Sequence, residues 1–250
     1  MTTTMPAVEV RGPALAPYPF GLFAAVTPTP ADADKGAAGV WWTSEACAAA
    51  GVTYSPCNVD VPDPINALAP NVVCGVNESS VSFTVYAYSD QSVGGRDLAE
   101  QFARASTLLQ AGEQAVVEAQ LWAALTAAAT PGTGGTGTLA TLAQAEQAAT
   151  SVYGGTPTVH VSRYHATLLH EALHAEGGRL RTVLGSDVVA GAGYDHTDAL
   201  IFVTGPVVVV RGPILNLGQH VDRTENTVSA VVERTYTLGW DCFASSHAIA

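Results

Sequence analysis

The clearest pattern of apolar positions runs from about Arg96 to Ala129. Apolar residues recur there at helical spacing, namely Leu98, Phe102, Ala105, Leu109, Val116, Leu121 and Leu125. This spacing puts them on one face of an α-helix, which at 1.5 Å per residue would be about 50 Å long. Gly112 is expected to bend the helix, and the glycine-rich run from Pro131 to end it. We therefore predict a long spine on which other elements pack.

The chain before this helix is rich in proline and has no sustained helical period. Ten of the 14 prolines in the whole sequence precede residue 71. Proline lacks a backbone donor and breaks helices, so residues 1–44 are predicted to form an extended arm without helix. The apolar run Tyr18–Phe23 in this arm is predicted to dock on a neighbouring subunit and to contribute little to its own chain. Residues Val81–Tyr88 alternate polar with apolar side chains, which predicts a strand.

The middle of the chain predicts a small α/β unit. Leu139–Thr150 has the pattern of a short alanine-rich helix, and Thr158–Val161 that of a strand. Arg163–Ala175 is predicted to be a second helix, with Ser162 as its N-cap and Gly177 just beyond its end.

The last fifty residues have strand patterns. They are IFVTGPVVVV from Ile201, TVSAVVERTYTLGW from Thr227, and a final CFASSHAI from Cys242. We expect them to form one sheet that packs on the long helix, which makes the fold class α+β.

Composition indicates a surface that mostly contacts protein. Charged residues make up 13% of the chain and apolar residues 48%, whereas an ordinary soluble protein carries about a quarter charged residues. The net charge is −12, which argues against tight binding of DNA phosphates. No apolar run approaches the ~20 residues of a membrane-spanning helix. Cys47, Cys57, Cys74 and Cys242 lack zinc-knuckle spacing, so buried thiols in a reducing cytosol are favoured, with disulfides among the first three left open.

One motif has the form of a catalytic site. Residues 170–174 match H-E-x-x-H, in which His170 and His174 would bind zinc and Glu171 would activate water. The longer metzincin pattern needs a third ligand where Leu180 stands, and also a later methionine, but none follows Met5. The metzincin interpretation therefore fails on two counts.

A thermolysin-like site could recruit Glu225 or Glu233, but both lie in the strand-like region and not on a second helix. We favour packing of the second helix through an apolar face of Leu168, Leu169, Leu173 and His165, with the motif's polar side chains outward. The pair Glu233–Arg234 is interpreted as a structural or intersubunit ion pair. The sequence thus predicts no catalytic, cofactor-binding or metal-binding residues.

The order of arm, hairpin region, long helix, α/β unit and closing sheet resembles the Hong Kong 97 fold of tailed-phage capsid proteins. The run PTVHVSRYHATLLHEALHAEGGRLRTVLGSDVVAGAGY is similar to the axial domain of such proteins, and ALIFVTGPVVVVRG with VVERTYTLGWDCFASSHAI to their final strands. The resemblance covers residues 96–250. It implies five parts: an N-arm (1–44), an E-loop region with flanking strands (45–95), a spine helix of the peripheral domain (96–131), an axial domain (132–200) and return strands (201–250).

This resemblance implies a structural role without enzymatic activity. The chain would assemble with itself into pentamers and hexamers of an icosahedral phage head, formed in the host cytoplasm around double-stranded DNA that it does not bind sequence-specifically. A portal and a scaffolding protein are implied as partners, the presence of a decoration protein is left open, and no membrane is implied. The alternatives are an encapsulin-like shell subunit and a zinc metalloprotease that uses the HEALH motif.

Two features depart from the family pattern. The type member cross-links its subunits through an E-loop lysine, whereas the only lysine here, Lys35, falls in the predicted N-arm. The 95 or so residues before the spine helix leave room for an arm and an E-loop, but not for a fused scaffolding segment. We therefore expect no lysine cross-link and a separate scaffolding protein.

Overall fold

The computed structural model describes residues 18–31, 81–92, 98–222, 224 and 227–250. The predictions for Lys35, for the first three cysteines and for Glu225 fall outside this part of the chain. Cys242 lies within it and is disulfide-bonded, so the interpretation as a buried free thiol is wrong for this residue. No helix of the described part is long and apolar enough to cross a membrane.

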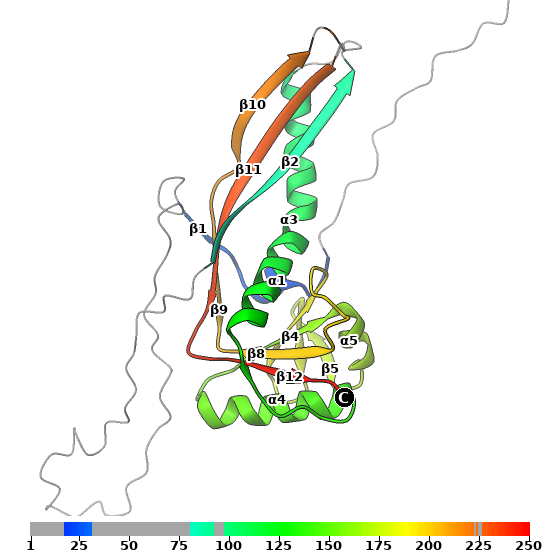
Figure 1. The fold of residues 1–250 in the computed structure, drawn as a ribbon, viewed down its shortest axis with the longest axis vertical. Helices are drawn as coiled ribbons and strands as arrows, with labels where there is room; N and C mark the ends of the chain where they lie inside the picture. Colours follow the sequence, from blue (N-terminus) through cyan, green and yellow to red (C-terminus); the bar gives the residue numbers. More distant parts are fainter. Residues whose placement is uncertain (1–17, 32–80, 93–97, 223, 225–226) are drawn as a thin grey trace, which may run out of the picture.

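The predicted spine is helix α3, Leu98–Ala128, which has 31 residues. Leu109, Leu121 and Leu125 of the predicted apolar face are buried. Val116 is 44% exposed, and its neighbour Val117 is buried in its place. The helix ends at a two-residue strand, β3 (Thr130–Pro131), at the start of the predicted terminating run. Figure 1 shows α3 lying along the full length of an elongated sheet.

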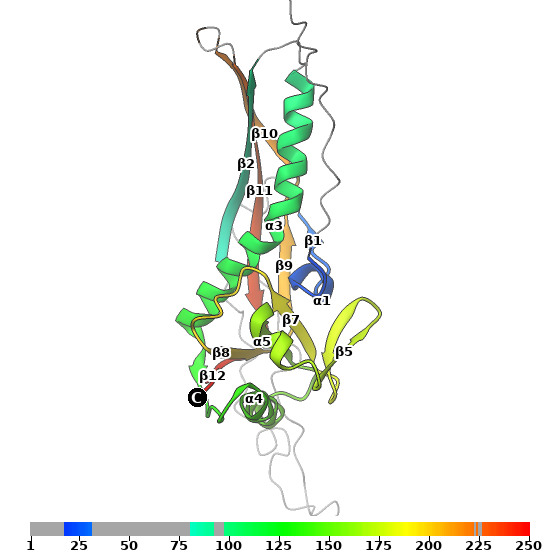
Figure 2. The same ribbon diagram turned by 90° about the vertical axis from the view of Figure 1, so that its right-hand side faces the viewer.

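Among the described residues, this elongated sheet has five strands. They are β1 (Thr29–Pro30), β2 (Val81–Ser92), β9 (Val207–Arg211), β10 (Leu215–Asp222) and β11 (Thr227–Trp240). The long strand β11 pairs antiparallel with β2 along one edge and with β10 and then β9 along the other. Its alternation buries Val228, Ala230 and Val232, and α3 packs on this sheet as predicted (Figure 2).

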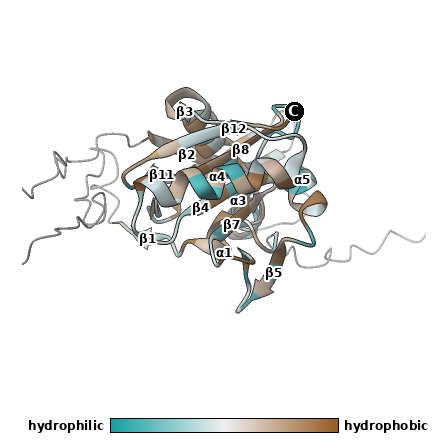
Figure 3. Ribbon diagram, turned by 90° about the horizontal axis from the view of Figure 1, so that it is seen from below, coloured by the Kyte–Doolittle hydropathy of each residue, from teal (hydrophilic) through white to brown (hydrophobic). Residues whose placement is uncertain are grey.

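A second sheet, with seven strands in the described part of the chain, forms a separate body around the carboxyl terminus. Its order is β3, β12 (Ala244–Ala248), β8 (Leu200–Thr204), β4 (Thr158–Ser162), β7 (Asp187–Gly191), β6 (Arg179–Thr182) and β5 (Leu173–Glu176). Helix α4 (Thr138–Val152) packs across it, as the view from below shows (Figure 3). The predicted short helix and the strand at β4 are thus present.

The expectation of one closing sheet is wrong. Strands β9 and β11 belong to the elongated sheet, whereas β8 and β12 belong to the seven-stranded sheet. Four of the five residues of β8 are buried, because Ile201 and Val203 pack with residues of α4 while Phe202 packs with residues of α3. A continuous apolar pattern predicts that a strand is buried, but it does not predict which sheet the strand joins.

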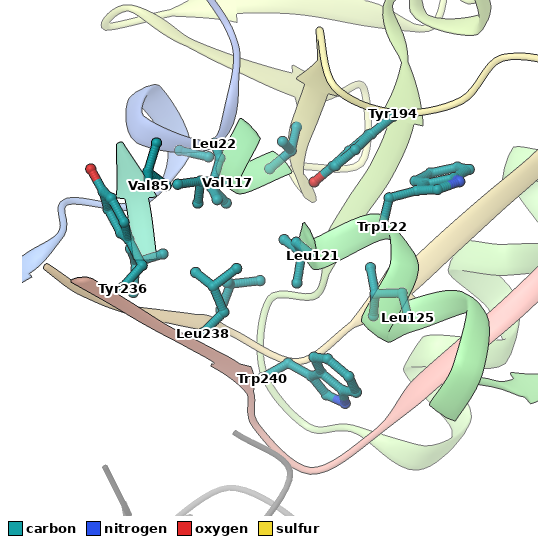
Figure 4. Packing of buried hydrophobic residues seen from close by; sticks show 14 of the residues in the cluster. Leu22, Val85, Val117, Leu121, Trp122, Leu125, Tyr194, Tyr236, Leu238 and Trp240 are labelled. Atoms are coloured by element: carbon teal, nitrogen blue, oxygen red, sulfur yellow. The ribbon is translucent and has the colours of Figure 1, made fainter. Parts of the chain in front are cut away.

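The amino-terminal segment also departs from prediction. Residues Leu22–Ala25 form one helical turn, α1, in a region expected to lack helix. Leu22 is fully buried, and Figure 4 shows it beside Val117 of the spine. Phe20 adopts a left-handed φ of 63°, and its carbonyl accepts a hydrogen bond from Ala190 N at 2.9 Å. Residues 20–26 therefore pack into or against the core of their own chain, whereas Tyr18 is 52% exposed.

Two apolar clusters hold these bodies together. The larger contains Leu22, Leu121, Trp122, Tyr194, Tyr236 and Trp240, and joins α1 and α3 to the elongated sheet (Figure 4). The smaller lies between α4 and the seven-stranded sheet, around Leu142, Val159 and Ile201. The spine helix thus connects both bodies, since Trp122 also stacks on Tyr194 and meets Phe202 edge-on.

Candidate functional site

The HEALH motif does not lie on a helix. Helix α5 ends at Leu168, His170 and Glu171 occupy a turn, and His174 stands in β5. The prediction of a helix over Arg163–Ala175 is therefore wrong in its second half. A helix would need Leu169 and Leu173 on one face, but here the chain turns after the buried Leu169 and starts a hairpin.

The hairpin turn explains this change. Gly177 and Gly178 have φ values of 56° and 82°, which suit a two-residue hairpin turn. This turn pairs Glu176 with Arg179 across β5 and β6. Gly177 therefore closes a hairpin and does not end a helix. Ser162 does cap α5 as predicted, because its hydroxyl accepts a hydrogen bond from His165 N.

The motif lacks the arrangement of a zinc site. His170 and Glu171 are highly exposed, and the closest approach of His170 Nε2 to Glu171 Oε1 is 3.9 Å. Within the described ranges, no group of three histidine, cysteine or acidic side chains could hold a metal ion. His165 and Leu169 pack inward as expected, but Leu168 is 54% exposed.

The buried polar groups of the molecule gather along the spine helix instead. The Glu113 carboxylate is 5% exposed and accepts hydrogen bonds from Arg234 Nη1 at 3.0 and 2.8 Å. Tyr236 Oη donates to the same carboxylate at 2.7 Å, and Arg211 Nη1 lies 3.6 Å away. Burial, and then the hydrogen bond to Glu113, raise the pKa of Tyr236. This network ties the middle of α3 to strands β9 and β11.

This geometry corrects the predicted Glu233–Arg234 pair. Successive residues of a strand point to opposite faces. Arg234 accordingly turns inward to Glu113, whereas Glu233 stands on the other face of β11. Because Glu233 and Arg234 are adjacent in one strand, their side chains lie on opposite faces of the sheet and do not form an ion pair with each other.

A second buried carboxylate, Glu118, binds backbone groups from two distant segments. Its side chain is fully buried. Oε1 accepts from Leu22 N at 2.8 Å, and Oε2 accepts from Ala192 N at 2.6 Å and Gly193 N at 3.1 Å. The segment after β7 is therefore held to the spine helix through the Glu118 side chain. A Cβ at Gly193 would lie 1.9 Å from Ala115 O, so only glycine fits there.

A buried histidine in the seven-stranded sheet contacts the segment after β7 that Glu118 binds. His160 of β4 is fully buried and is hydrogen-bonded to Tyr194 Oη at 2.9 Å and to Thr204 Oγ1 at 3.0 Å. Burial lowers the pKa of His160 to about 3, so the ring is neutral in the folded protein. Both ring nitrogens are thus hydrogen-bonded inside the core, so His160 links β4 to β8 and to Tyr194.

Glu113 and Glu118 were not predicted to be core residues, although the helical spacing contained a signal. Glu113 lies four residues after Leu109 and four before Val117, on the face predicted to be apolar. A carboxylate at such a position is buried and must find donors. The spine therefore turns two of its three acidic side chains, Glu113 and Glu118, inward.

Several large apolar side chains of the described residues are exposed. The most exposed are Leu184 (79%), Tyr86 (72%), Val183 (67%) and Leu139 (61%). Three of these four lie on the seven-stranded body, around α4 and the turn between β6 and β7. Clustered exposed apolar groups mark surfaces that contact other proteins.

Solved structures from two phages share this arrangement over nearly their whole length. A structure from Microbacterium phage Oxtober96 has a TM-score of 0.52 at 13% identity, over 98% of this chain and 96% of that chain. A structure from Mycobacterium phage Che8 has a TM-score of 0.51 at 12% identity, over 99% and 98%. No protein-family model and no curated protein matches the sequence.

The likeness establishes the fold. The chain has the α+β fold of these phage structures, with a spine helix on an elongated sheet and a second α/β body. The Hong Kong 97-type capsid fold predicted from the order of elements is therefore confirmed.

Proposed function

We propose that this chain is the major capsid protein of a tailed phage, which assembles with itself into the pentamers and hexamers of an icosahedral head around double-stranded DNA. The observation that carries the proposal is the shared fold across 98% or more of this chain. The role is structural, because the polar groups that resembled a zinc site stand apart on the surface.

Composition and surface support this role. A shell subunit buries large apolar interfaces, which accounts for a charged fraction of 13% and for the exposed apolar side chains of the second body. The net charge of −12 suits a container that holds DNA without gripping its phosphates. We further propose a separate scaffolding protein and a portal as partners, and the five-part division from N-arm to return strands.

Electron microscopy and mass photometry of the purified protein test the proposal. We expect closed icosahedral particles, or discrete pentamers and hexamers, in place of a 25.7 kDa monomer. A monomer at all concentrations would contradict a capsid role. Shells that package protein cargo in place of DNA in the native host would support the encapsulin-like alternative instead.

A further inference from the structure

A groove on the second body has no role in the fold. It lies between α4 and the turn that joins β6 to β7, and its volume is about 540 Å³. Its walls are mainly apolar and include Leu139, Leu142, Ala143, Pro157, Val183 and Leu184. Three of these side chains, Leu139, Val183 and Leu184, are more than 60% exposed at its rim. An uncovered apolar surface of this kind favours a protein partner.

A buried carboxylate lies in the wall of this groove. Glu146 of α4 is 6% exposed, and its Oε1 accepts hydrogen bonds from Thr182 Oγ1 at 2.7 Å and Ser186 Oγ at 2.6 Å. Its other oxygen, Oε2, has no donor among the described residues and is not sealed from solvent. Glu146 is the only ionisable residue lining the groove within the described ranges. A partner that covers the groove must therefore bring a donor, best a cation, to this oxygen.

The neighbours in the proposed shell are copies of this chain, which has only ten basic residues. Most described arginines are already engaged. Arg211 and Arg234 pair with Glu113, Arg181 pairs with Glu176 and Asp187, and Arg163 donates to Pro19 O.

Arg179 differs from these arginines. It has no hydrogen bond or ion pair with any described residue. It stands at the start of β6, directly after the glycine turn, on the β5–β6 hairpin that projects from the second body (Figure 2). The hairpin thus presents a free cation away from the body of its own chain.

We propose that the β5–β6 hairpin of one copy docks in the Glu146 groove of the next, with Arg179 donating to Glu146 Oε2. This inference rests on the proposed self-assembly. Groove and hairpin are different surfaces of one chain, so the contact is head-to-tail and closes into a ring when repeated by rotation. The apolar rim of Leu139, Val183 and Leu184 would be covered in the ring.

A double-mutant cycle tests the contact through the fraction of protein in capsomers and shells, measured by mass photometry and electron microscopy. Glu146→Gln keeps an acceptor for Thr182 and Ser186, and Arg179→Gln lies on the surface, so both variants are expected to fold. Each is expected to weaken assembly about tenfold, and the double variant no further than either single one. Additive effects, or wild-type assembly in both single variants, would overturn the proposal.

A second pair of variants tests the apolar rim. Leu184→Asp is expected to abolish assembly while circular dichroism stays unchanged, whereas the control Leu168→Asp, on another exposed leucine, is expected to assemble normally. Normal shells from Leu184→Asp would also overturn the inference and leave the capsid role standing. Failure of the wild-type chain to form any oligomer would instead contradict the proposed function itself.

Discussion

Glu118 Oε1 on the spine helix accepts a hydrogen bond at 2.8 Å from the backbone N–H of Leu22, 96 residues earlier in the chain. The same carboxylate receives Ala192 N and Gly193 N from the segment after β7. One fully buried side chain thus holds the amino-terminal turn, the spine and the second body in a fixed arrangement.

We expect Glu118→Gln to destabilise the subunit strongly. The amide nitrogen would meet backbone donors where an acceptor is needed, so at least one buried N–H loses its partner, at a cost of about 1–3 kcal/mol. Urea unfolding of the dissociated subunit measures this loss. Glu171→Gln, on an exposed carboxylate, is the control and should change stability by less than about 0.5 kcal/mol. Equal stabilities would contradict the role of Glu118.

Leu22→Ala is expected to lower the free energy of unfolding by about 2–5 kcal/mol, the usual range for a buried leucine. The control Leu168→Ala, at a leucine that is 54% exposed, should cost much less. This prediction replaces the sequence-based expectation that the run Tyr18–Phe23 contributes little to its own chain, from which a chain lacking residues 1–30 would fold normally. We now expect that deletion to destabilise the subunit itself, which circular dichroism during thermal unfolding would detect.

Two arginines that contact Glu113 should differ in importance. The Arg234 side chain is 13% exposed and approaches Glu113 to 2.8 Å, whereas Arg211 is 36% exposed and lies 3.6 Å away. Removing one partner of a buried pair costs about 3–5 kcal/mol, because the other charge stays buried without it. Arg234→Ala should therefore destabilise the subunit more than Arg211→Ala in chemical denaturation. The reverse order would show that Arg211 is the main partner.

The buried His160 predicts a loss of stability in acid. Its pKa is about 3 in the folded protein and near 6.5 when the chain is unfolded, so below pH 6.5 only the unfolded state binds the proton. Stability should fall as the pH drops from 6.5 toward 3, by up to about 1.4 kcal/mol per pH unit from this group. Unfolding curves of His160→Gln should show a smaller fall than wild type. His170→Gln, at an exposed histidine, should follow the wild type.

The HEALH motif is predicted to bind no stoichiometric zinc. His170 lies in a turn and His174 in a strand, and neither is near a third ligand in the described part of the chain. Elemental analysis of the purified protein is the measurement. The double variant His170→Ala, His174→Ala should assemble as the wild type does. One zinc per chain, lost in this double variant, would show that the surface does form a site.

Elements with a local period could be predicted. The apolar repeat of the spine, the alternation of Val81–Tyr88 and the alanine-rich run at Leu139 each specify an element through neighbours within one or two turns of chain, and each is present at nearly the predicted bounds. The order of these elements was enough to predict the capsid-type fold.

The predictions that failed concern segments whose secondary structure or burial depends on residues far away in the sequence. The leucines of Arg163–Ala175 suit a helix, but pairing of β5 with β6 ended it at Leu168. Proline-rich sequence argued against core structure near Leu22, yet Glu118 supplies the acceptor that its backbone lacks locally. The Glu146 groove also depends on distant residues. Thr182 and Ser186 donate hydrogen bonds to one oxygen of Glu146 on α4, and the spacing of residues within α4 does not predict this contact.

The sequence by itself determined the spine helix, the strand at β2 and the helix α4, since periodicity reports how side chains distribute around one element. Only the tertiary structure decided that β8 and β12 leave β9 and β11 for another sheet, and that Glu113 and Glu118 point inward. The physical reason is that burial of a strand or a carboxylate depends on donors and apolar partners far along the chain, which local spacing does not encode.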